Sequence, residues 1–298
     1  MKHAYLILAH AFPEQLEEII NLLNTDKHDF FIHIDKKNFS EMLNSSAVQN
    51  LQHRKNVFFL PKMRSVNWGG ANQFFATIDL LQFARARGAY DYYHLISGQD
   101  YPVQSNEKID EFFENQDYSY FGLDVRDASR YSFRWDAFCL MDLINVRRGP
   151  GIKKWCCRFQ NAQKRLLLPF IRLRRPLPFP AYKGSQWWSM TAELADYILR
   201  YLREHPEYRR RFLFTNSCDE VFFHTLAYNS PLKDKISSDI PRYISWKRKY
   251  DEQSLPRVLD ESDYEDIIRE NVLFCRKIDP ERSKTLKERL RRKILETC

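Results

Sequence analysis

Hydrophobic positions in the first third of the chain alternate between short continuous runs and helical spacing. The runs at 4–9, 30–34, 57–60 and 92–96 each predict a strand covered on both faces, as in a parallel sheet. Between the runs, apolar residues recur at helical spacing, namely Leu16, Ile19, Ile20 and Leu23 after Pro13, and then Phe74, Ile78 and Leu81. We therefore expect an α/β fold, Rossmann-like, with a mostly parallel sheet flanked by helices.

The pattern is less regular in the rest of the chain. Thr191 is expected to cap a helix, because apolar residues follow it at helical spacing, and another helix is expected from Ser217. Residues 281–295 predict a basic amphipathic helix. Residues 127–180 show no clean hydrophobic period, so we expect an irregular basic lobe there. We treat residues 1–298 as one domain with two halves, 1–126 and 127–298.

Ligands of doubly wound sheets bind at the carboxyl ends of the strands, where Asp35 and Asp100 are expected. The chain has no Gly-x-Gly-x-x-Gly, Walker or Gly-x-Ser-x-Gly motif, which argues against dinucleotide binding, P-loop hydrolysis and α/β-hydrolase chemistry. Asp35 and Trp68 could contact a nucleotide through a carboxylate and a stacking ring. Spacing alone favours a strand-end turn residue for Asp35 and a core aromatic for Trp68.

The net charge of +8 comes from one segment. Between Leu143 and Ala192 there is no Asp or Glu, and the Lys and Arg residues there carry eleven positive charges; +8 less +11 leaves −3 for the rest of the chain. These cations are Arg147, Arg148, Lys153, Lys154, Arg158, Lys164, Arg165, Arg172, Arg174, Arg175 and Lys183. With its interspersed aromatic residues, the segment is either a solvated loop or a surface that docks on anionic lipid or acidic glycan.

Cysteine usage and hydropathy suggest a compartment. The six cysteines form no Cys-x-x-Cys pair and no regular framework, which fits a reducing environment. No apolar run approaches the roughly 20 residues of a membrane helix, and the start does not resemble a signal peptide. We expect a soluble, cytoplasmic protein.

Ser217 and Glu220 have the spacing of a capping box, in which the glutamate bonds back to the capping residue. Alternatively, Glu220 at a helix start accepts a proton from an incoming hydroxyl. The pattern alone favours the cap.

Two late basic clusters, 242–249 and 274–277, are either solvated faces or a clamp on a diphosphate. No Asp-x-Asp occurs and no histidine and carboxylate spacing suggests a metal site, so we expect cations to stabilise any departing diphosphate.

Eight short motifs, in order, resemble the core-2/I-branching N-acetylglucosaminyltransferase family, which includes peptide O-xylosyltransferases, and in particular its short bacterial members. They are AYLILAH (4–10), HIDKK (33–37), SVNWGG (65–70), LISGQDYP (95–102), GSQWWSMT (184–191), DEVFFHT (219–225), RYISW (242–246) and FCRKID (274–279). Each is weak alone, but the ordered set is specific and spans nearly the entire chain except the basic middle.

The resemblance implies a GT-A type fold and an inverting, metal-independent transfer from a UDP-sugar to a glycan hydroxyl, without a cofactor. It also assigns roles: Glu220 is the catalytic base; His10, Asp35 and Trp68 lie at the uridine; Arg257, Arg276 and Lys277 bind the diphosphate; Asp100, Gln186 and Trp246 contact substrate. The half at 1–126 would bind the nucleotide sugar and the half at 127–298 the acceptor.

The resemblance leaves the substrates open. The donor sugar would be N-acetylglucosamine or a related hexose or pentose, and the acceptor a glycan, with a lipid-linked form as one alternative. A role in bacterial surface polysaccharide synthesis, with peripheral contact to an anionic membrane and no nucleic acid, is the leading hypothesis. The alternatives are xylosyl transfer to a hydroxyl, because residues 222–225 resemble that branch too, and a non-catalytic protein that binds anionic glycan or nucleic acid.

Overall fold

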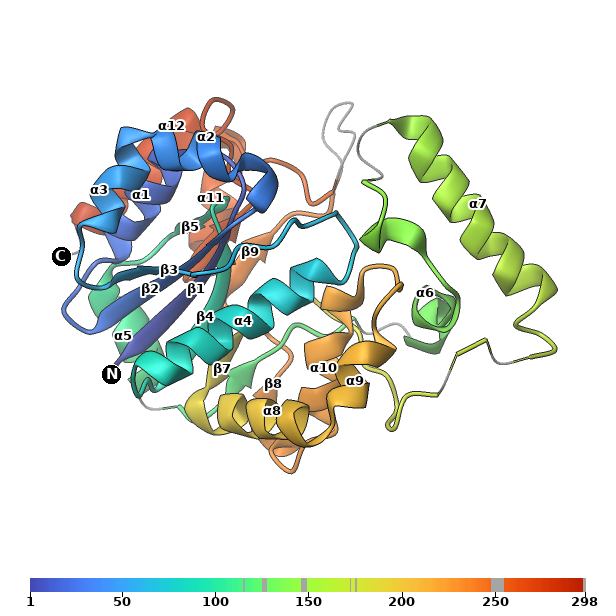
Figure 1. Ribbon diagram of the computed structural model, residues 1–298. Coiled ribbons are helices and arrows are strands. Elements are labelled where there is room, and N and C mark those ends of the chain that lie inside the picture. The colour runs from blue at the N-terminus through green and yellow to red at the C-terminus, as the bar shows by residue number, and fades with distance from the viewer. Residues whose placement is uncertain are drawn as a thin grey trace.

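The computed structural model describes residues 1–114, 116–124, 128–145, 149–171, 173–174, 176–247 and 255–296 (Figure 1). The strands are β1 His3–Ala9, β2 His28–Ile34, β3 Val57–Phe59, β4 Tyr92–Ser97, β5 Asp100–Pro102, β6 Ser119–Tyr120, β7 Ser189–Thr191, β8 Ile236–Ser237, β9 Arg242–Ile244 and β10 Phe274–Arg276. The α-helices are α1 Pro13–Leu23, α2 Phe39–Asn44, α3 Ser46–Gln52, α4 Asn72–Arg87, α5 Asn106–Glu114, α6 Phe133–Asp136, α7 Pro150–Leu166, α8 Ala192–Glu204, α9 Pro206–Arg211, α10 Phe222–Tyr228, α11 Tyr264–Arg269 and α12 Lys284–Leu295.

The main sheet has the strand order β3-β2-β1-β4-β7-β6-β8. β3, β2, β1 and β4 are parallel, whereas β7 is antiparallel to both β4 and β6. A smaller sheet, β5-β10-β9, brings the C-terminal part of the chain beside β5, which follows β4 closely in sequence. The α/β fold with a mostly parallel sheet is therefore confirmed, and the carboxyl ends of β1, β2 and β4 meet at one edge.

The parallel strands are covered on both faces, as their apolar runs predict. In β1, Ala4 and Leu6 pack into one core, which also contains residues of α4, α8 and α10. Tyr5 and Ile7 point to the opposite face and pack into a second core with residues of α1, α3 and α12. Figure 1 shows these helix groups on the two sides of the sheet. Successive side chains of a strand point to opposite faces of the sheet, and here the side chains on each face pack against an apolar layer of helices.

Several predicted helices are confirmed in detail. The Thr191 hydroxyl accepts a hydrogen bond from the Leu194 amide at 3.4 Å, so Thr191 caps α8. In α12, Leu286, Leu290 and Ile294 are buried as one stripe. Among the described residues, no helix is both long enough and apolar enough to cross a bilayer.

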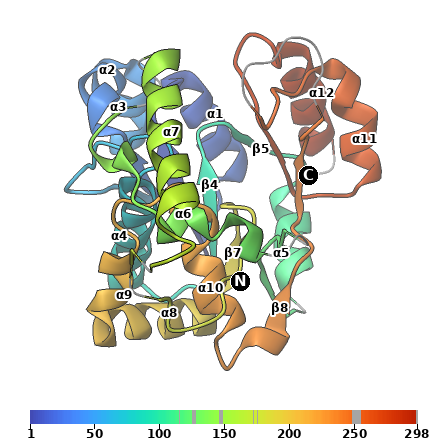
Figure 2. The same ribbon diagram turned by 90° about the vertical axis from the view of Figure 1, so that its right-hand side faces the viewer.

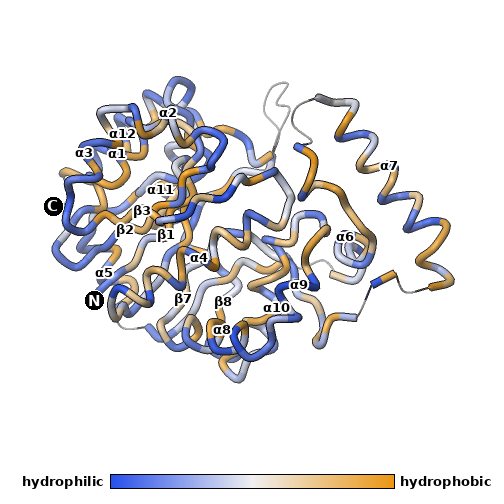
Figure 3. The backbone as a smooth tube through the Cα atoms, viewed as in Figure 1, coloured by the Kyte–Doolittle hydropathy of each residue, from blue (hydrophilic) through white to orange (hydrophobic). Residues whose placement is uncertain are grey.

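The prediction of an irregular basic lobe was wrong for residues 150–166, which form the 17-residue helix α7. The buried positions of α7 are Cys156, Gln160 and Gln163, and the glutamine side chains bond to backbone groups of Phe133, Arg134 and Phe138. Two of the three inward residues are polar, so the sequence carries no apolar stripe. Figure 3 shows α7 alternating between hydrophilic and hydrophobic residues along its length.

Candidate functional site

Asp35 stands where the resemblance expects a uridine contact, directly after β2. Its amide bonds to the Ala9 carbonyl at 2.8 Å, which joins it to the end of β1. Its Oδ1 accepts from the amides of Lys37 at 3.0 Å and Val66 at 3.2 Å. The side chain of Asn38 bonds to the carbonyl of His10, which is exposed after β1. The Asp35 amide thus joins the ends of β1 and β2, and its carboxylate holds the loop that carries Trp68.

Trp68 is not a core aromatic, because 39% of it is exposed. Lys153 of α7 lies over its ring, 5.0 Å from the centroid, so the basic helix reaches this loop. The next residue, Gly69, has a φ of 74° and accepts a hydrogen bond from the Ser217 amide at 2.8 Å. A side chain is disfavoured at that φ, which explains the glycine. The Trp68 loop is therefore anchored on the segment that leads to Glu220.

The capping box predicted at Ser217 is not formed. Ser217 has a left-handed φ of 53° and makes no side-chain cap, residues 218–220 form a 3₁₀ turn, and α10 begins only at Phe222. The Glu220 side chain instead pairs with two cations: its Oε2 lies 3.1 Å from Lys183 Nζ and 3.2 Å from Arg134 Nη1. The Ser217 amide, which a capping box would direct to Glu220, donates to the Gly69 carbonyl at 2.8 Å instead, while the carboxylate pairs with the two cations.

The Glu220 carboxylate is held but accessible. Its side chain is 29% exposed, and no described residue donates a hydrogen bond to Oε1. Lys183 also pairs with Asp124 at 3.2 Å, and both Lys183 and Arg134 lie 5.1 Å from the centroid of the Tyr131 ring. Lys183 and Arg134 thus hold one oxygen of the carboxylate, and the other, Oε1, has no hydrogen-bond donor among the described residues. In the sequence, Lys183 stands out only as part of a run of cations, and no motif points to Arg134.

Asp219, next to Glu220, differs from it in environment. Asp219 is 9% exposed, and its Oδ1 is buried without a hydrogen bond. Burial, and after it the charge of Glu220, raises the pKa of Asp219 to about 7. The two adjacent carboxyls are therefore inequivalent, and the more accessible Glu220 is the better candidate to exchange a proton with a substrate.

Asp100 and Arg276 form a buried ion pair. Asp100 Oδ2 lies 2.6 Å from Arg276 Nη1 and also accepts from the amide and hydroxyl of Ser97. The Arg276 guanidinium stacks on Trp187, 4.0 Å from the ring centroid, and burial lowers its pKa. The charges of the pair compensate each other. Asp100 Oδ1 is buried without a hydrogen bond.

Arg257 is committed to protein partners. It makes two contacts with the Asp263 carboxylate, one of them at 2.8 Å, and its Nε donates to Ser245 Oγ at 3.0 Å. Ser245 precedes Trp246, which is 57% exposed. Arg257 therefore holds the end of β9 that presents Trp246, and a diphosphate contact would require its pair with Asp263 to open.

Gln186 and Lys277 complete the set of expected site residues. Gln186 is buried; its Oε1 accepts from Gln73 at 2.7 Å, and its Nε2 has no hydrogen bond. The Lys277 carbonyl accepts from the Leu259 amide at 2.9 Å, which fixes its backbone. Arg248 and Lys249 of the late basic cluster, and Arg147, Arg148, Arg172 and Arg175 of the basic segment, lie outside the described residues.

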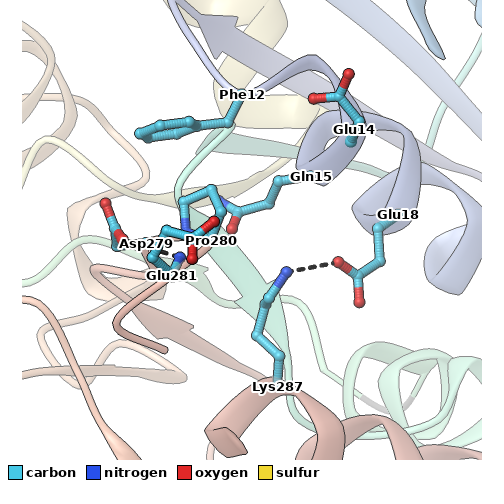
Figure 4. Close-up of a pocket in the computed structure, with 8 residues that line it drawn as sticks. All are labelled: Phe12, Glu14, Gln15, Glu18, Asp279, Pro280, Glu281 and Lys287. Carbon is cyan, nitrogen blue, oxygen red and sulfur yellow. Dashed lines mark hydrogen bonds and ion pairs between the residues drawn. The ribbon is translucent and has the colours of Figure 1, made fainter. Parts of the chain in front are cut away.

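A cavity of about 350 Å³ lies beside α1 and was not anticipated from the sequence (Figure 4). Its lining carries four acidic side chains, Glu14, Glu18, Asp279 and Glu281, against the single cation Lys287, which pairs with Glu18 at 2.8 Å. None of the expected site residues lines it. Because this surplus of carboxylates repels phosphate, the cavity is unsuited to a nucleotide diphosphate.

Comparison with known proteins identifies relatives along most of the chain. Xylosyltransferase 2 of Rattus norvegicus is 26% identical over 255 residues, and xylosyltransferase 1 of Pan troglodytes is 23% identical over 253 residues. Both alignments cover 83% of this chain but only 27% and 24% of the relatives, so the chain spans about a quarter of their length.

Solved structures of two transferases also align with most of this chain. Mouse xyloside xylosyltransferase 1 aligns with 92% of this chain and 97% of its own at 9% identity and a TM-score of 0.39. The galactosyltransferase LgtC aligns with 98% of this chain and 95% of its own at 10% identity and a TM-score of 0.42. The family profile described as "Branch: Core-2/I-Branching enzyme" matches residues 3–268. The chain belongs to the Core-2/I-branching enzyme family.

Proposed function

We propose that this protein is an inverting glycosyltransferase that moves a sugar from a UDP-sugar to a glycan hydroxyl, with Glu220 as the base and without a catalytic metal. Family membership supports glycosyl transfer. The observation that carries the role of Glu220 is its geometry: two cations hold Oε2, while Oε1 has no protein donor among the described residues. A carboxylate that is held through one oxygen, and whose other oxygen has no donor among the described residues, fits a general base.

The proposed reaction is a displacement at the anomeric carbon of the donor sugar. The acceptor oxygen attacks the anomeric carbon on the side opposite UDP, its proton moves to Glu220 Oε1, and the bond from the anomeric carbon to the UDP oxygen breaks. Lys183 and Arg134 keep the carboxylate oriented through this transfer. UDP leaves with its bonding electron pair, and cationic side chains stabilise the charge that develops on it. A positioned base contributes roughly 10²–10⁴ in rate.

The donor is proposed to bind along the carboxyl ends of the strands. His10, Asp35 and Trp68 would contact the uridine, and Arg276 with Lys277 the diphosphate. Arg257 would act as a positioning residue behind Trp246, because Asp263 and Ser245 occupy its guanidinium. Gln186 and Trp246 would face the acceptor, and a substrate contact of Asp100 would require its buried carboxylate to become exposed. Alanine at Lys277 should weaken UDP binding, whereas unchanged affinity in calorimetry would remove Lys277 from the site.

The proposed donor is a UDP-sugar, and the proposed acceptor is a glycan. UDP-N-acetylglucosamine and UDP-xylose are the first donors to test, the latter because the relatives reported above are named xylosyltransferases. A glycan hydroxyl in bacterial surface polysaccharide synthesis is the proposed acceptor. A hydrolysis assay with a panel of UDP-sugars needs no acceptor and would identify the donor. If the protein instead bound DNA with an affinity that falls steeply as salt rises, and did not bind UDP, a non-catalytic binding protein would be favoured.

Glu220→Gln tests the base. The amide keeps the size of the side chain but cannot take up a proton, so kcat should fall by roughly 10²–10⁴ with an unchanged Kd for UDP. The matched control is Glu193→Gln, because Glu193 is an exposed glutamate of α8 that approaches Lys235 only at 3.8 Å. Turnover of the Glu220 variant within threefold of wild type would refute the assignment.

Metal independence is tested with the same assay. Initial rates of the purified protein should be equal with excess EDTA, with Mg²⁺ and with Mn²⁺, when each is measured within minutes of mixing. A rate that is zero in EDTA and restored by Mn²⁺ or Mg²⁺ within seconds would refute cationic side chains as the sole stabilisers of UDP.

We further propose that α7 docks on an anionic membrane surface. Trp155 is 53% exposed, Phe170 just beyond the helix is 84% exposed, and the rings of Trp155 and Phe159 stack at 6.0 Å. The helix contains five Lys or Arg residues and no acid. Figure 2 looks onto the side of the molecule that carries α7. Aromatic side chains among exposed cations match the interfacial region of an anionic bilayer.

Vesicle flotation tests this surface. Wild-type protein should float with phosphatidylcholine vesicles that contain 30% phosphatidylglycerol, and not with phosphatidylcholine alone. The double variant W155S/F159S should lose most of the bound fraction, whereas Tyr118→Ser should not, since Tyr118 is similarly exposed at 45% but lies outside the basic segment. Equal binding of both variants would contradict the proposal, and binding to acidic glycan or DNA alone would reassign the surface.

A further inference from the structure

Two histidines and an aspartate meet at the amino ends of the strands, away from the candidate site. His3 begins β1 and His28 begins β2, and they are direct partners in the parallel register. Asp110 comes from α5, and its Oδ1 lies 3.3 Å from His3 Nε2 and 3.1 Å from His28 Nε2. His3 is six residues from Ala9 at the carboxyl end, which places the cluster about 20 Å from the opposite edge of the sheet.

In His3 and His28, the ring nitrogen that is not directed at Asp110, Nδ1, already has a hydrogen-bond partner. His28 Nδ1 lies 2.7 Å from the Leu23 carbonyl, which can only accept, so the proton of a neutral ring stands on Nδ1. His3 Nδ1 lies 2.8 Å from His94 Nε2, and His94 Nδ1 lies 2.8 Å from Ser189 Oγ. Metal-binding histidines use their second nitrogen in this way, which fixes the tautomer and the ring orientation.

The atoms that face one another in the cluster, His3 Nε2, His28 Nε2 and Asp110 Oδ1, lack complementary donors and acceptors unless a cation lies between them. A neutral His28 with its proton on Nδ1 turns the lone pair of Nε2 toward Asp110 Oδ1, which is also an acceptor, only 3.1 Å away. His3 is fully buried, and its Nε2 is among the buried atoms without a hydrogen bond. Acceptors that converge in a buried site repel each other unless a positive charge lies between them.

We propose that His3 Nε2, His28 Nε2 and Asp110 bind one divalent transition-metal ion, Zn²⁺ by preference. The three ligand atoms lie within 4.8 Å of one another. Zinc bonds of 2.0–2.1 Å in tetrahedral geometry separate adjacent ligands by about 3.3–3.4 Å, close to the two distances from Asp110 Oδ1. Two imidazoles with one carboxylate suit Zn²⁺ better than Mg²⁺ or Ca²⁺, which prefer oxygen ligands.

The ion would be structural. It would join β1, β2 and α5, and its place at the amino ends of the strands, about 20 Å from their carboxyl ends, separates it from the proposed donor site. The Asp110 side chain is 22% exposed, so water can reach the fourth coordination position. The proposal is independent of the proposed function: loss of the ion should lower thermal stability without changing the catalytic step.

The test uses the full chain, purified without a histidine tag, stripped with chelator and titrated with ZnCl₂. We expect about one zinc per chain after dialysis, a Tm several degrees above that of the stripped protein, and a Co²⁺ form with a visible d–d spectrum. His28→Gln and Asp110→Asn should each lower zinc affinity at least 10-fold and remove the Tm shift, as expected for a lost ligand. The control His53→Gln, at an exposed histidine, should bind zinc normally.

Three results would overturn the proposal: less than 0.1 zinc per folded wild-type chain, unchanged zinc affinity in both ligand variants, or X-ray absorption of the wild-type zinc form without imidazole scattering. The last measurement needs no variant, so it decides the matter even if the substituted proteins do not fold. An inactive protein that binds zinc normally would count against the proposed function and leave the metal site standing.

Discussion

Gly184→Ala is predicted to disrupt the segment that holds Glu220. Gly184 forms an isolated antiparallel bridge with Leu123, and its amide donates to the Glu220 carbonyl at 2.9 Å. A Cβ at Gly184 would lie 1.8 Å from the Gly122 carbonyl oxygen and 2.5 Å from His224 Nε2. Neither neighbour yields easily, because one is backbone and the other is a buried ring bonded to that same carbonyl at 3.1 Å.

The expected magnitude follows from these distances. Ordinary contact begins at 3.4 Å, so the two segments must separate by about 1.6 Å, which is 3.4 less 1.8. Overpacking costs about 1–3 kcal/mol, and stretching the bonds Gly184 N to Glu220 O and Ser185 N to Gly122 O costs about 1 kcal/mol each. The free energy of unfolding should fall by about 3–5 kcal/mol, and the Tm by about 5–10 °C.

Activity should fall as well. A displacement of this size at Glu220 is expected to lower kcat by about 10²-fold, measured by UDP-sugar turnover at a temperature where the variant is folded. Urea unfolding followed by circular dichroism gives the stability. The control is Gly151→Ala, where a Cβ meets no atom within 4 Å and α7 should gain up to about 1 kcal/mol. A Gly184 variant with a Tm within 2 °C of wild type and kcat within threefold would refute this reasoning.

Two further predictions concern stability. The raised pKa of Asp219, about 7, means that the native state binds more protons than the unfolded state between about pH 4 and 7, so the unfolding free energy falls as pH rises through that interval. Asp219→Asn should flatten this fall in urea titrations at pH 5 and 8, and parallel profiles would contradict it. Thr191→Ala should cost about 1 kcal/mol by removing the cap of α8, whereas Thr191→Ser should retain most of it; equal Tm values for the three proteins would show that the cap is unimportant.

Local patterns predicted the elements well where burial is two-sided or striped. The runs that became β1, β2 and β4 are buried on both faces, and the stripe of α12 is set by the period of the helix itself. The capping box predicted at Ser217 is absent because residues distant in sequence take both partners: Gly69 accepts from the Ser217 amide, and Lys183 and Arg134 pair with Glu220. The prediction from local patterns failed at α7 because glutamine amides, not apolar side chains, fix that helix to the protein.

The motifs identified most of the candidate residues but not their partners. Asp100 with Arg276 and Arg257 with Asp263 are ion pairs that no spacing predicts, and they change what each cation is free to do. Likewise, His3, His28 and Asp110 share no motif and converge only because two parallel strands begin side by side against α5.

By itself, the sequence determined the α/β class, the parallel strands β1 to β4, helices such as α1, α4, α8 and α12, and the family, since these depend on periodicity and on short ordered motifs. Only the tertiary structure decided which oxygen of Glu220 pairs with Lys183 and Arg134, which cations are already paired with carboxylates, and which distant side chains converge. The physical reason is range: secondary structure follows from contacts a few residues apart, whereas ion pairs and ligand clusters depend on how the chain brings distant segments within a few ångströms.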